Sequence, residues 1–184
     1  MESLRILGVD PGLARLGFGI IERGPGDSLH HVAHGCIETG ADTPLPERLR
    51  HIFQQLTELC RTHRPAVMAV EELFFSRNTT TAFTVGQARG VALLAGAEAG
   101  LAVMEYTPMQ VKQAVTGYGR ADKRQVQEMV RLLLRLTSVP KPDDAADALA
   151  VAIAHAHAGR IGELEARLAA GKRTGWVWER GKFR

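Results

Sequence analysis

The feature of this sequence that most constrains its fold is the order of its strand-like and helix-like segments. Three short apolar runs come first, at residues 5–10, 17–22 and 29–38, and short glycine-rich joins connect them. Short connections favour antiparallel neighbours, so these runs predict a meander. Helical and strand-like periodicities then alternate. The expected helices and strands of this part cover residues 46–63, 66–71, 79–99 and 102–106.

The second half of the chain has clear helix-start signals. Thr107 precedes Pro108, with a glutamine three residues after the threonine, which predicts a helix that ends at Gly117. Asp122 gives a second cap signal, and a third helix is expected from Asp143 to about Gly159. Together the segments predict an α/β fold, with a five-stranded mixed sheet flanked by helices.

Composition bounds the broad class of protein. At 184 residues with 45% hydrophobic residues, the chain is long enough to bury one substantial core. We expect residues 1–170 to form one domain and residues 171–184 a basic tail, which either adds phosphate contacts or is disordered. No apolar run approaches the ~20 residues of a membrane span. The N-terminus lacks the shape of a signal peptide and the two cysteines have no metal-type spacing, so a cytoplasmic location is expected.

Charge is unevenly distributed although the net charge is only +3. An acidic stretch at residues 142–159 lies between basic stretches at residues 105–141 and 160–184. Solvated helix faces would explain this pattern, and so would a metal site surrounded by phosphate contacts. Charge alone does not separate the two interpretations.

Acidic residues end two of the expected strands. Asp10 closes the first strand, and the Pro11-Gly12 turn carries the backbone away from its carboxylate. Glu71 and Glu72 close the fourth strand. Because adjacent strand residues face opposite sides of a sheet, only one of these glutamates can join Asp10.

A third acidic group opens the last expected helix. Asp144 and Asp147 are three residues apart, so they share one face of the first turn, whereas Asp143 is better placed to cap. Favourable interaction with the helix dipole would explain acids here without any site. However, Asp144 and Asp147 share their face with Ala148 and Val151, which indicates that they point toward protein.

These carboxylates would suit a hard divalent cation if they converge. Two strand ends and an acidic helix turn can supply an all-oxygen pocket, which Mg²⁺ prefers. Two such ions can activate water and stabilise the leaving oxygen in phosphodiester cleavage. His155 and His157 lie further along the helix, and we expect them to be structural or exposed.

Five segments of the chain resemble the RuvC family of Holliday-junction resolvases, over roughly residues 4–160. Each segment is a weak signal alone, but their order and spacing are specific. The segments are Gly8-Val9-Asp10-Pro11-Gly12, Ala69-Val70-Glu71-Glu72-Leu73-Phe74, Gly86-Gln87-Ala88-Arg89-Gly90, Gln110-Val111-Lys112-Gln113 and Asp144-Ala145-Ala146-Asp147-Ala148-Leu149-Ala150.

The resemblance implies a ribonuclease-H-like fold and a homodimer that resolves four-way DNA junctions by symmetric paired nicks leaving 5′-phosphate ends. It implies one or two Mg²⁺ ions per subunit, with Mn²⁺ as the alternative ion, and collaboration with a branch-migration motor. It places phosphate contacts on Lys112 and Lys123 and an aromatic residue at the junction centre on Phe74. The four metal-binding carboxylates it implies are Asp10, Glu71, Asp144 and Asp147.

Further DNA contacts are expected from the residues themselves. Lys123 and Arg124 begin a helix, where the dipole disfavours cations by ~0.3–1 kcal/mol, and a bound phosphate would offset this cost. Tyr118 and Arg120 lie in a basic loop whose aromatic ring could stack on an unpaired base. The alternative for Lys123 and Arg124 is that both are simply solvated.

The helix at residues 79–99 has a face of mostly small residues, Gly86, Gly90, Leu94 and Ala97. This face would pack closely against either the protein's own sheet or a second subunit, and the resemblance favours the second. Two other functions fit parts of the pattern: an actin-like ATPase or sugar kinase, and a junction-binding protein without activity. The chain is short for the former and has no Walker-type loop.

Overall fold

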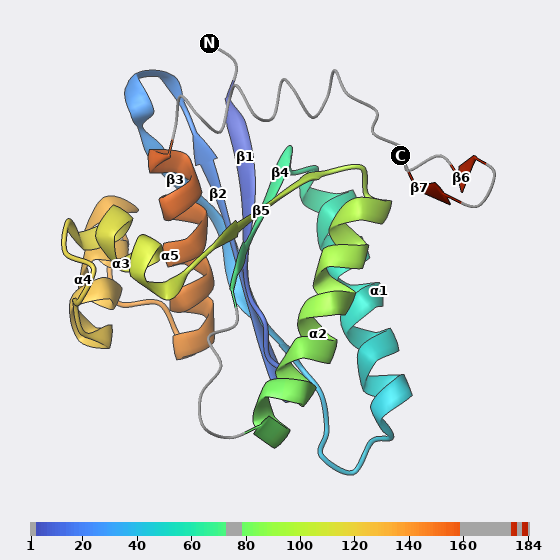
Figure 1. The fold of residues 1–184 in the computed structure, drawn as a ribbon. Coiled ribbons are helices and arrows are strands. Elements are labelled where there is room, and N and C mark those ends of the chain that lie inside the picture. The colour runs from blue at the N-terminus through green and yellow to red at the C-terminus, as the bar shows by residue number, and fades with distance from the viewer. Residues whose placement is uncertain (1–2, 73–78, 159–177, 180–181, 184) are drawn as a thin grey trace.

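The computed structural model describes residues 3–72, 79–158, 178–179 and 182–183. Its centre is a five-stranded sheet in the order β3-β2-β1-β4-β5 (Figure 1). β1, β2 and β3 form an antiparallel meander. β4 runs parallel to β1, and β5 runs parallel to β4. The mixed sheet is therefore confirmed. The strands are β1 (Leu4–Asp10), β2 (Arg15–Arg23), β3 (Leu29–Glu38), β4 (Val67–Glu71) and β5 (Ala102–Tyr106).

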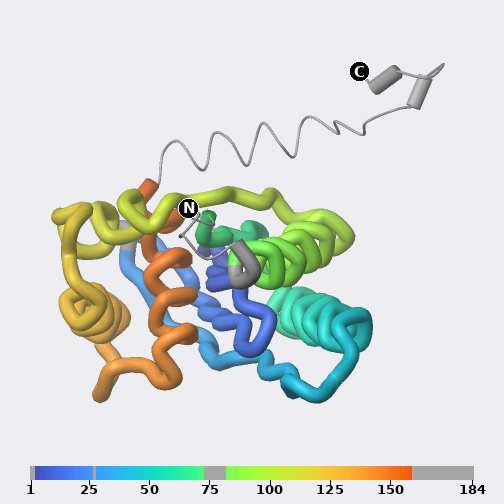
Figure 2. Tube along the Cα trace, turned by 60° about the horizontal axis from the view of Figure 1, so that its bottom comes forward, coloured from blue at the N-terminus to red at the C-terminus, as the bar shows by residue number. Residues whose placement is uncertain are grey.

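Helices cover both faces of this sheet (Figures 1 and 2). α1 and α2 pack together on one face, while α5 lies on the other face, against β1 and β2, with α3 and α4 outside it. A short 3₁₀ turn, Pro25–Asp27, joins β2 to β3. The α-helices are α1 (Leu45–His63), α2 (Thr79–Glu98), α3 (Pro108–Thr116), α4 (Lys123–Leu133) and α5 (Asp143–His157).

The helix-start signals in the sequence form as expected in two cases. Thr107 and Gln110 make a reciprocal capping box on α3, and Asp122 and Gln125 make another on α4. Gly117 ends α3 in the left-handed conformation with φ 75°.

The capping role expected of Asp143 was wrong. The residue before α5 is Pro142, and no side chain caps this helix. Asp143 is already the first helical residue, and its Oδ1 accepts a hydrogen bond from Lys141 Nζ at 2.9 Å. Its carboxylate is therefore directed to a lysine instead of to the orphan backbone N–H groups.

The two faces of β1 bury different neighbours. Leu7 and Val9 belong to the core beneath α1 and α2, whereas Ile6 belongs to the core beneath α5. Gly8, on the α5 side, allows this helix to approach closely, because a Cβ there would lie 2.1 Å from the Ala148 carbonyl oxygen. Alternation then directs the next residue on this side, Asp10, toward the beginning of α5.

The tail contains two further described segments, β6 (Trp178–Glu179) and β7 (Lys182–Phe183), which pair with each other. The other tail residues lie outside the described residues, as does the predicted helix end at Gly159. Among the helices that the structure describes, none is both long and apolar enough to cross a membrane.

Candidate active site

Asp10 and Glu71 end neighbouring parallel strands on the same side of the sheet. The register pairs Gly8 with Ala69 and Val9 with Val70, so Asp10 and Glu71 are the next residues of β1 and β4. Ala69 belongs to the core beneath α5, and Glu71, two residues later, faces the same way. The choice between adjacent glutamates, which alternation left open, therefore falls on Glu71.

The first turn of α5 brings two more carboxylates to this edge. The backbone of Asp144 lies directly over Gly17 of β2, where a Cβ would be 2.0 Å from the Asp144 carbonyl oxygen. Gly17 pairs with Asp10 across the antiparallel β1–β2 ladder. Asp144 and Asp147 both raise the pKa of Asp10 through their charge. The four acids expected from the sequence therefore form one interacting group.

Asp10 is the most perturbed member of this group. Burial and then the charges of Glu71, Asp147 and Asp144 raise the pKa of Asp10 from 3.8 to about 8. A hydrogen bond between Asp10 and Glu71 contributes in the same direction, with Asp10 as the protonated donor. Burial also raises the pKa of Glu71 and of Asp147. Without a bound cation, this edge of the sheet therefore holds a proton at neutral pH.

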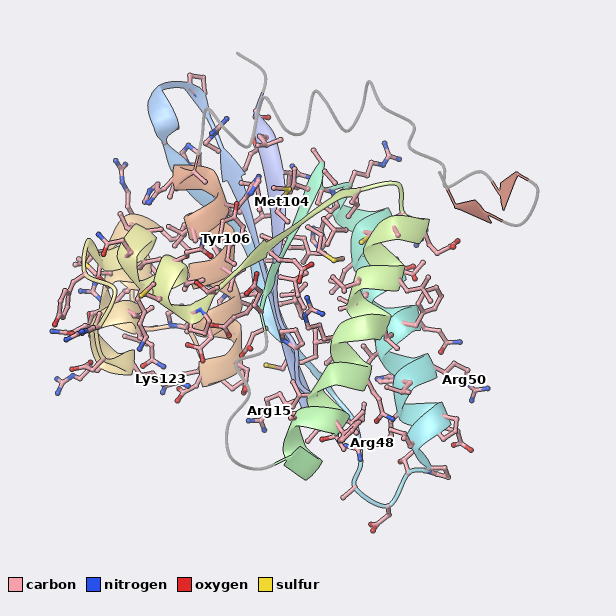
Figure 3. The ribbon with its side chains drawn as sticks, in the orientation of Figure 1. Arg15, Arg48, Arg50, Met104, Tyr106 and Lys123 are labelled. Carbon is pink, nitrogen blue, oxygen red and sulfur yellow. The ribbon has the colours of Figure 1, made fainter. Side chains whose placement is uncertain are left out.

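Basic side chains compensate the remaining negative charge. Lys123 Nζ lies 3.0 Å from Asp147 Oδ2 and 3.6 Å from Asp143 Oδ2. Burial alone would lower the pKa of Lys123, but its hydrogen bond to Asp147 and the surrounding carboxylates raise it overall. Arg15 Nη1 lies 3.5 Å from Asp144 Oδ2. Figure 3 shows Arg15 and Lys123 at the same end of the sheet, one on each side of α5.

The ion pair of Lys123 changes one interpretation of the sequence. Its place in the first turn of α4 left two interpretations open, a bound phosphate that offsets the helix dipole or a simply solvated side chain. The structure supplies another partner, because the carboxylates of Asp147 and Asp143 stabilise this cation directly. Arg124, the next residue, is exposed.

The acids are gathered, but they are not arranged as ligands around one point. Within the part of the chain that the structure describes, no group of three or more histidine, cysteine or acidic side chains is positioned to hold a metal ion. That these four acids bind a metal ion therefore stays a prediction. The contacts that these acids do make compensate their charge: Asp10 shares a proton with Glu71, while Asp144 and Asp147 pair with Arg15 and Lys123.

The chemistry of the donor set nevertheless fits a hard cation. All four acidic groups offer oxygen, which Mg²⁺ and Mn²⁺ accept. Cys36 lies near Asp144, but burial and the charge of Asp144 raise the pKa of its thiol to about 11, so the thiol stays protonated. Among the described residues at this edge of the sheet, no thiolate is therefore present to favour softer metals.

A cleft of about 230 Å³ opens beside the acids. Glu71 and Asp147 line one part of it, and Lys112 and Lys123 line another, with Pro108, Val111, Val126 and Ala150 completing the walls. Both lysines that the resemblance singled out therefore border the acidic group. A phosphate entering this cleft would meet cations close to the carboxylates.

Tyr118 and Arg120 lie elsewhere. They line a larger groove of about 680 Å³. The residues that α3 contributes to this groove, Met109, Gln110 and Gln113, differ from those that it contributes to the cleft. Tyr118 is 58% exposed. Phe74, expected at the junction centre, lies outside the described residues. The structure thus brings together the carboxylates and two lysines, and separates the Tyr118 loop from them.

The histidines of α5 have structural surroundings, as expected. His155 is buried, with its Nδ1 2.7 Å from the Tyr106 hydroxyl, and burial lowers its pKa to about 4. His157 is exposed and its Nδ1 lies 2.9 Å from the Ala114 carbonyl oxygen.

Sequence reasoning missed Arg15 as a neighbour of the acidic group. Its signal was present in the strand alternation, because Arg15 and Gly17 face the same side of β2. What the sequence did not reveal was that α5 begins directly over Gly17.

A mixed sheet of this order, with acids at two strand ends and on the covering helix, defines a protein of the ribonuclease-H-like class with a carboxylate site. The family model described as crossover junction endodeoxyribonuclease RuvC matches residues 6–155. The chain belongs to this RuvC family, and not to the ATPases or sugar kinases that were the alternative.

Individual relatives agree with this assignment. Crossover junction endodeoxyribonuclease RuvC of Brevibacillus brevis is 60% identical over 153 residues, which cover 83% of this chain and 92% of the relative. The structure of T. thermophilus RuvC in complex with Holliday junction substrate matches with a TM-score of 0.82 and 40% identity, covering 86% of this chain and 96% of that one. The yeast mitochondrial Holliday junction resolvase Ydc2 shares the fold at a TM-score of 0.64 and 12% identity, over 91% of this chain and 86% of that one.

Proposed function

We propose that this protein is an endonuclease that resolves four-way DNA junctions by symmetric paired nicks, with water as the nucleophile. The observation that carries the proposal is the meeting of Asp10, Glu71, Asp144 and Asp147 at one edge of the sheet, beside a cleft lined by two lysines. Membership of the RuvC family supplies the substrate class.

The four carboxylates are the residues that would hold divalent cations, one or two per subunit. When bound, Mg²⁺ or Mn²⁺ supplies activation of the water and stabilisation of the leaving oxygen. The protein's own residues prepare this site. Asp10 releases the proton that it shares with Glu71, and Asp147 separates from Lys123.

The two lysines of the cleft would then bind the DNA. Lys123, once separated from Asp147, keeps its charge in the cleft, where Lys112 also lies. Two cations there would hold the scissile phosphate close to the carboxylates. This exchange of partners lets one lysine stabilise the acidic group before DNA arrives and bind phosphate afterwards. It also explains why the free protein tolerates four acids in one place.

The homodimer in this proposal uses α2. The face of mostly small residues points away from the sheet, since Gly90, Leu94 and Ala97 are exposed while Ala88, Ala92 and Ala95 are buried. Packing against the protein's own sheet, one of the two alternatives, was therefore wrong. A Cβ at Gly90 would find no atom within 4 Å, and Phe83, on the same side, is 75% exposed. Such an apolar helix face suits a second copy of the chain.

Two dimer-related sites would place one nick in each of two opposed strands, which is the symmetry that a four-way junction presents. The expected branch-migration motor remains part of the proposal through the family resemblance alone.

The decisive experiment uses a synthetic four-way junction with each strand labelled in turn. With Mg²⁺, we expect nicks at symmetry-related positions in two opposed strands, and ligation of the products without prior phosphorylation. A linear duplex of the same sequence should stay intact under the same conditions. Junction binding without any nick would support the non-catalytic alternative, whereas equal cutting of the duplex would contradict junction specificity.

A further inference from the structure

Each aspartate at the start of α5 pairs with at least one cation, and these cations come from different parts of the chain. Lys141, in the loop before α5, pairs with Asp143, and Lys123, at the start of α4, pairs with Asp147. Asp144 is approached from the sheet, by Arg15 of β2. Of these three cations, Lys123 is accounted for by the proposed function, and Lys141 neighbours an acid outside the proposed ligands.

Arg15 is fixed before it reaches Asp144. It is the first residue of β2 and pairs directly with Glu38, the last residue of β3. Its Nε donates a hydrogen bond to Glu38 Oε1 at 3.0 Å. Nη1 of the same guanidinium lies 3.5 Å from Asp144 Oδ2. This distance is that of an ion pair and is longer than a tight hydrogen bond. The planar guanidinium therefore bridges two carboxylates on two different elements.

Asp144 contacts the sheet through both its side chain and its backbone. Arg15 Nη1 approaches Oδ2. The backbone of Asp144 is already held against Gly17. The Asp144 side chain is therefore approached by Arg15 from the sheet, while its backbone is packed against Gly17.

We propose that Arg15 is a positioning residue that orients Asp144 for the metal ion, with Glu38 holding the guanidinium in place. The proposal rests on the proposed function, because it assumes that Asp144 is a ligand. In metal sites generally, carboxylate ligands are hydrogen-bonded by neighbouring groups, whose loss costs ~10–100-fold in metal affinity or activity. Arg15 would play this part from the sheet side.

The proposal makes a prediction whose sign differs from that of simple electrostatics. A positive charge near a cation site weakens cation binding by repulsion, so neutralising Arg15 should strengthen metal binding if charge were its only effect. If Arg15 instead positions Asp144, neutralising it should weaken metal binding. The direction of the change therefore separates the two roles.

The experiment measures Mn²⁺ affinity of the full chain by titration calorimetry, without DNA, for the wild type, Arg15→Gln and Arg50→Gln. Arg50 is an exposed arginine of α1, away from the acids, and Figure 3 shows it on the far side of the sheet from Lys123. This control changes net charge by the same amount. We expect Arg15→Gln to weaken Mn²⁺ binding by ~10-fold, within the range for groups that orient ligands, and Arg50→Gln to leave it unchanged.

Folding is monitored by the melting temperature of the metal-free proteins. The side chain of Arg15 is 47% exposed, so we expect only a small shift for Arg15→Gln. Unchanged or tighter Mn²⁺ binding by this variant would overturn the positioning role. A wild-type protein that binds no Mn²⁺ would instead contradict the proposed function, which keeps the two failures distinct.

Discussion

At the scale of the residue, the main feature of the site is the repulsion between its carboxylates. Four carboxylates meet at one edge of a sheet, where burial makes ionisation costly. The free protein answers with a proton on Asp10 and with two cations, Arg15 and Lys123, which pair with the aspartates of α5. In the proposed function, a divalent cation would displace these partners, which would link proton release to metal binding.

The raised pKa of Asp10 predicts how metal affinity depends on pH. Below about 8, Asp10 is protonated in the folded protein, so a metal ion must displace a proton. We expect Mg²⁺ affinity to rise with pH by up to about tenfold per unit and to level off near pH 8. Titration calorimetry at several pH values measures this dependence. Affinity that stays constant from pH 6 to 8 would contradict the protonated state of Asp10.

The raised pKa of Asp10 also predicts how the stability of the metal-free protein depends on pH. Because the folded state keeps a proton that the unfolded chain loses near pH 4, the free energy of unfolding should fall as pH rises from about 4 to 8. Asp10→Asn should flatten this decline and reduce the rise in melting temperature that Mg²⁺ gives to the wild type. Denaturant melts with and without Mg²⁺ provide both readings.

A third prediction at this scale distinguishes adjacent aspartates of α5. Asp144→Asn should reduce junction cleavage by at least ~100-fold while leaving junction binding intact, because several kcal/mol of transition-state stabilisation depend on the ligands. Asp143→Asn is the matched control, since the nearest cation to Asp143 is Lys141, at 2.9 Å, whereas Asp144 is among the charges that raise the pKa of Asp10. If Asp143→Asn were the more damaging change, the third ligand would be misassigned.

At the scale of the element, close packing of α5 on the sheet sets the geometry of the site. Three glycines of β1 and β2, namely Gly8, Gly17 and Gly19, face this helix, and a Cβ at any of them would overlap its backbone. The facing side of α5 is rich in alanine, including Ala145, Ala148 and Ala152, all fully buried. Small residues on both surfaces bring the first turn of α5 down to the ends of β1 and β4.

This packing predicts a large effect of one methyl group at Gly17. In Gly17→Ala the new Cβ would meet the Asp144 carbonyl oxygen at 2.0 Å, and backbone cannot move aside without shifting the helix. We expect a loss of ~1–3 kcal/mol of stability together with weaker metal binding. Gly35→Ala on β3 is the control, because its nearest neighbours at 3.0 and 3.1 Å are ring atoms of Phe18, a side chain that can yield. Chemical denaturation compares the two variants.

At the scale of the whole molecule, α5, whose first turn carries Asp144, covers one side of the sheet and α2 covers the other (Figures 1 and 2). A dimer formed through α2, as proposed above, would make its contact on the side of the sheet opposite α5. The separation also means that pairing of subunits and loading of metal can be tested independently.

The dimer prediction follows from the exposed side chains of α2. Leu94 is 52% exposed, and Leu94→Glu would place a charge within the proposed interface. We expect sedimentation to give twice 20.0 kDa for the wild type and 20.0 kDa for the variant. Leu132→Glu is the control, because Leu132 is 54% exposed on α4, away from this face. A wild-type protein that sediments as a monomer at all concentrations would contradict the interface.

The sequence by itself determined the order and limits of most elements. The strands at residues 29–38 and 102–106 have the predicted bounds, and the capping boxes of α3 and α4 form between the predicted residues. These features depend on side-chain periodicity and on contacts three residues apart, which are local properties of a chain. The identity of the acidic residues was local information too.

Only the tertiary structure decided how these acids relate to their surroundings. The parallel register of β1 and β4 directs Glu71, and not Glu72, toward α5. The approach of α5 to Gly17 brings Asp144 within reach of Arg15, and the position of α4 pairs Lys123 with Asp147. Strand register and helix docking are set by packing between residues far apart in the chain, so no local pattern could reveal that these acids would each meet a proton or a cation.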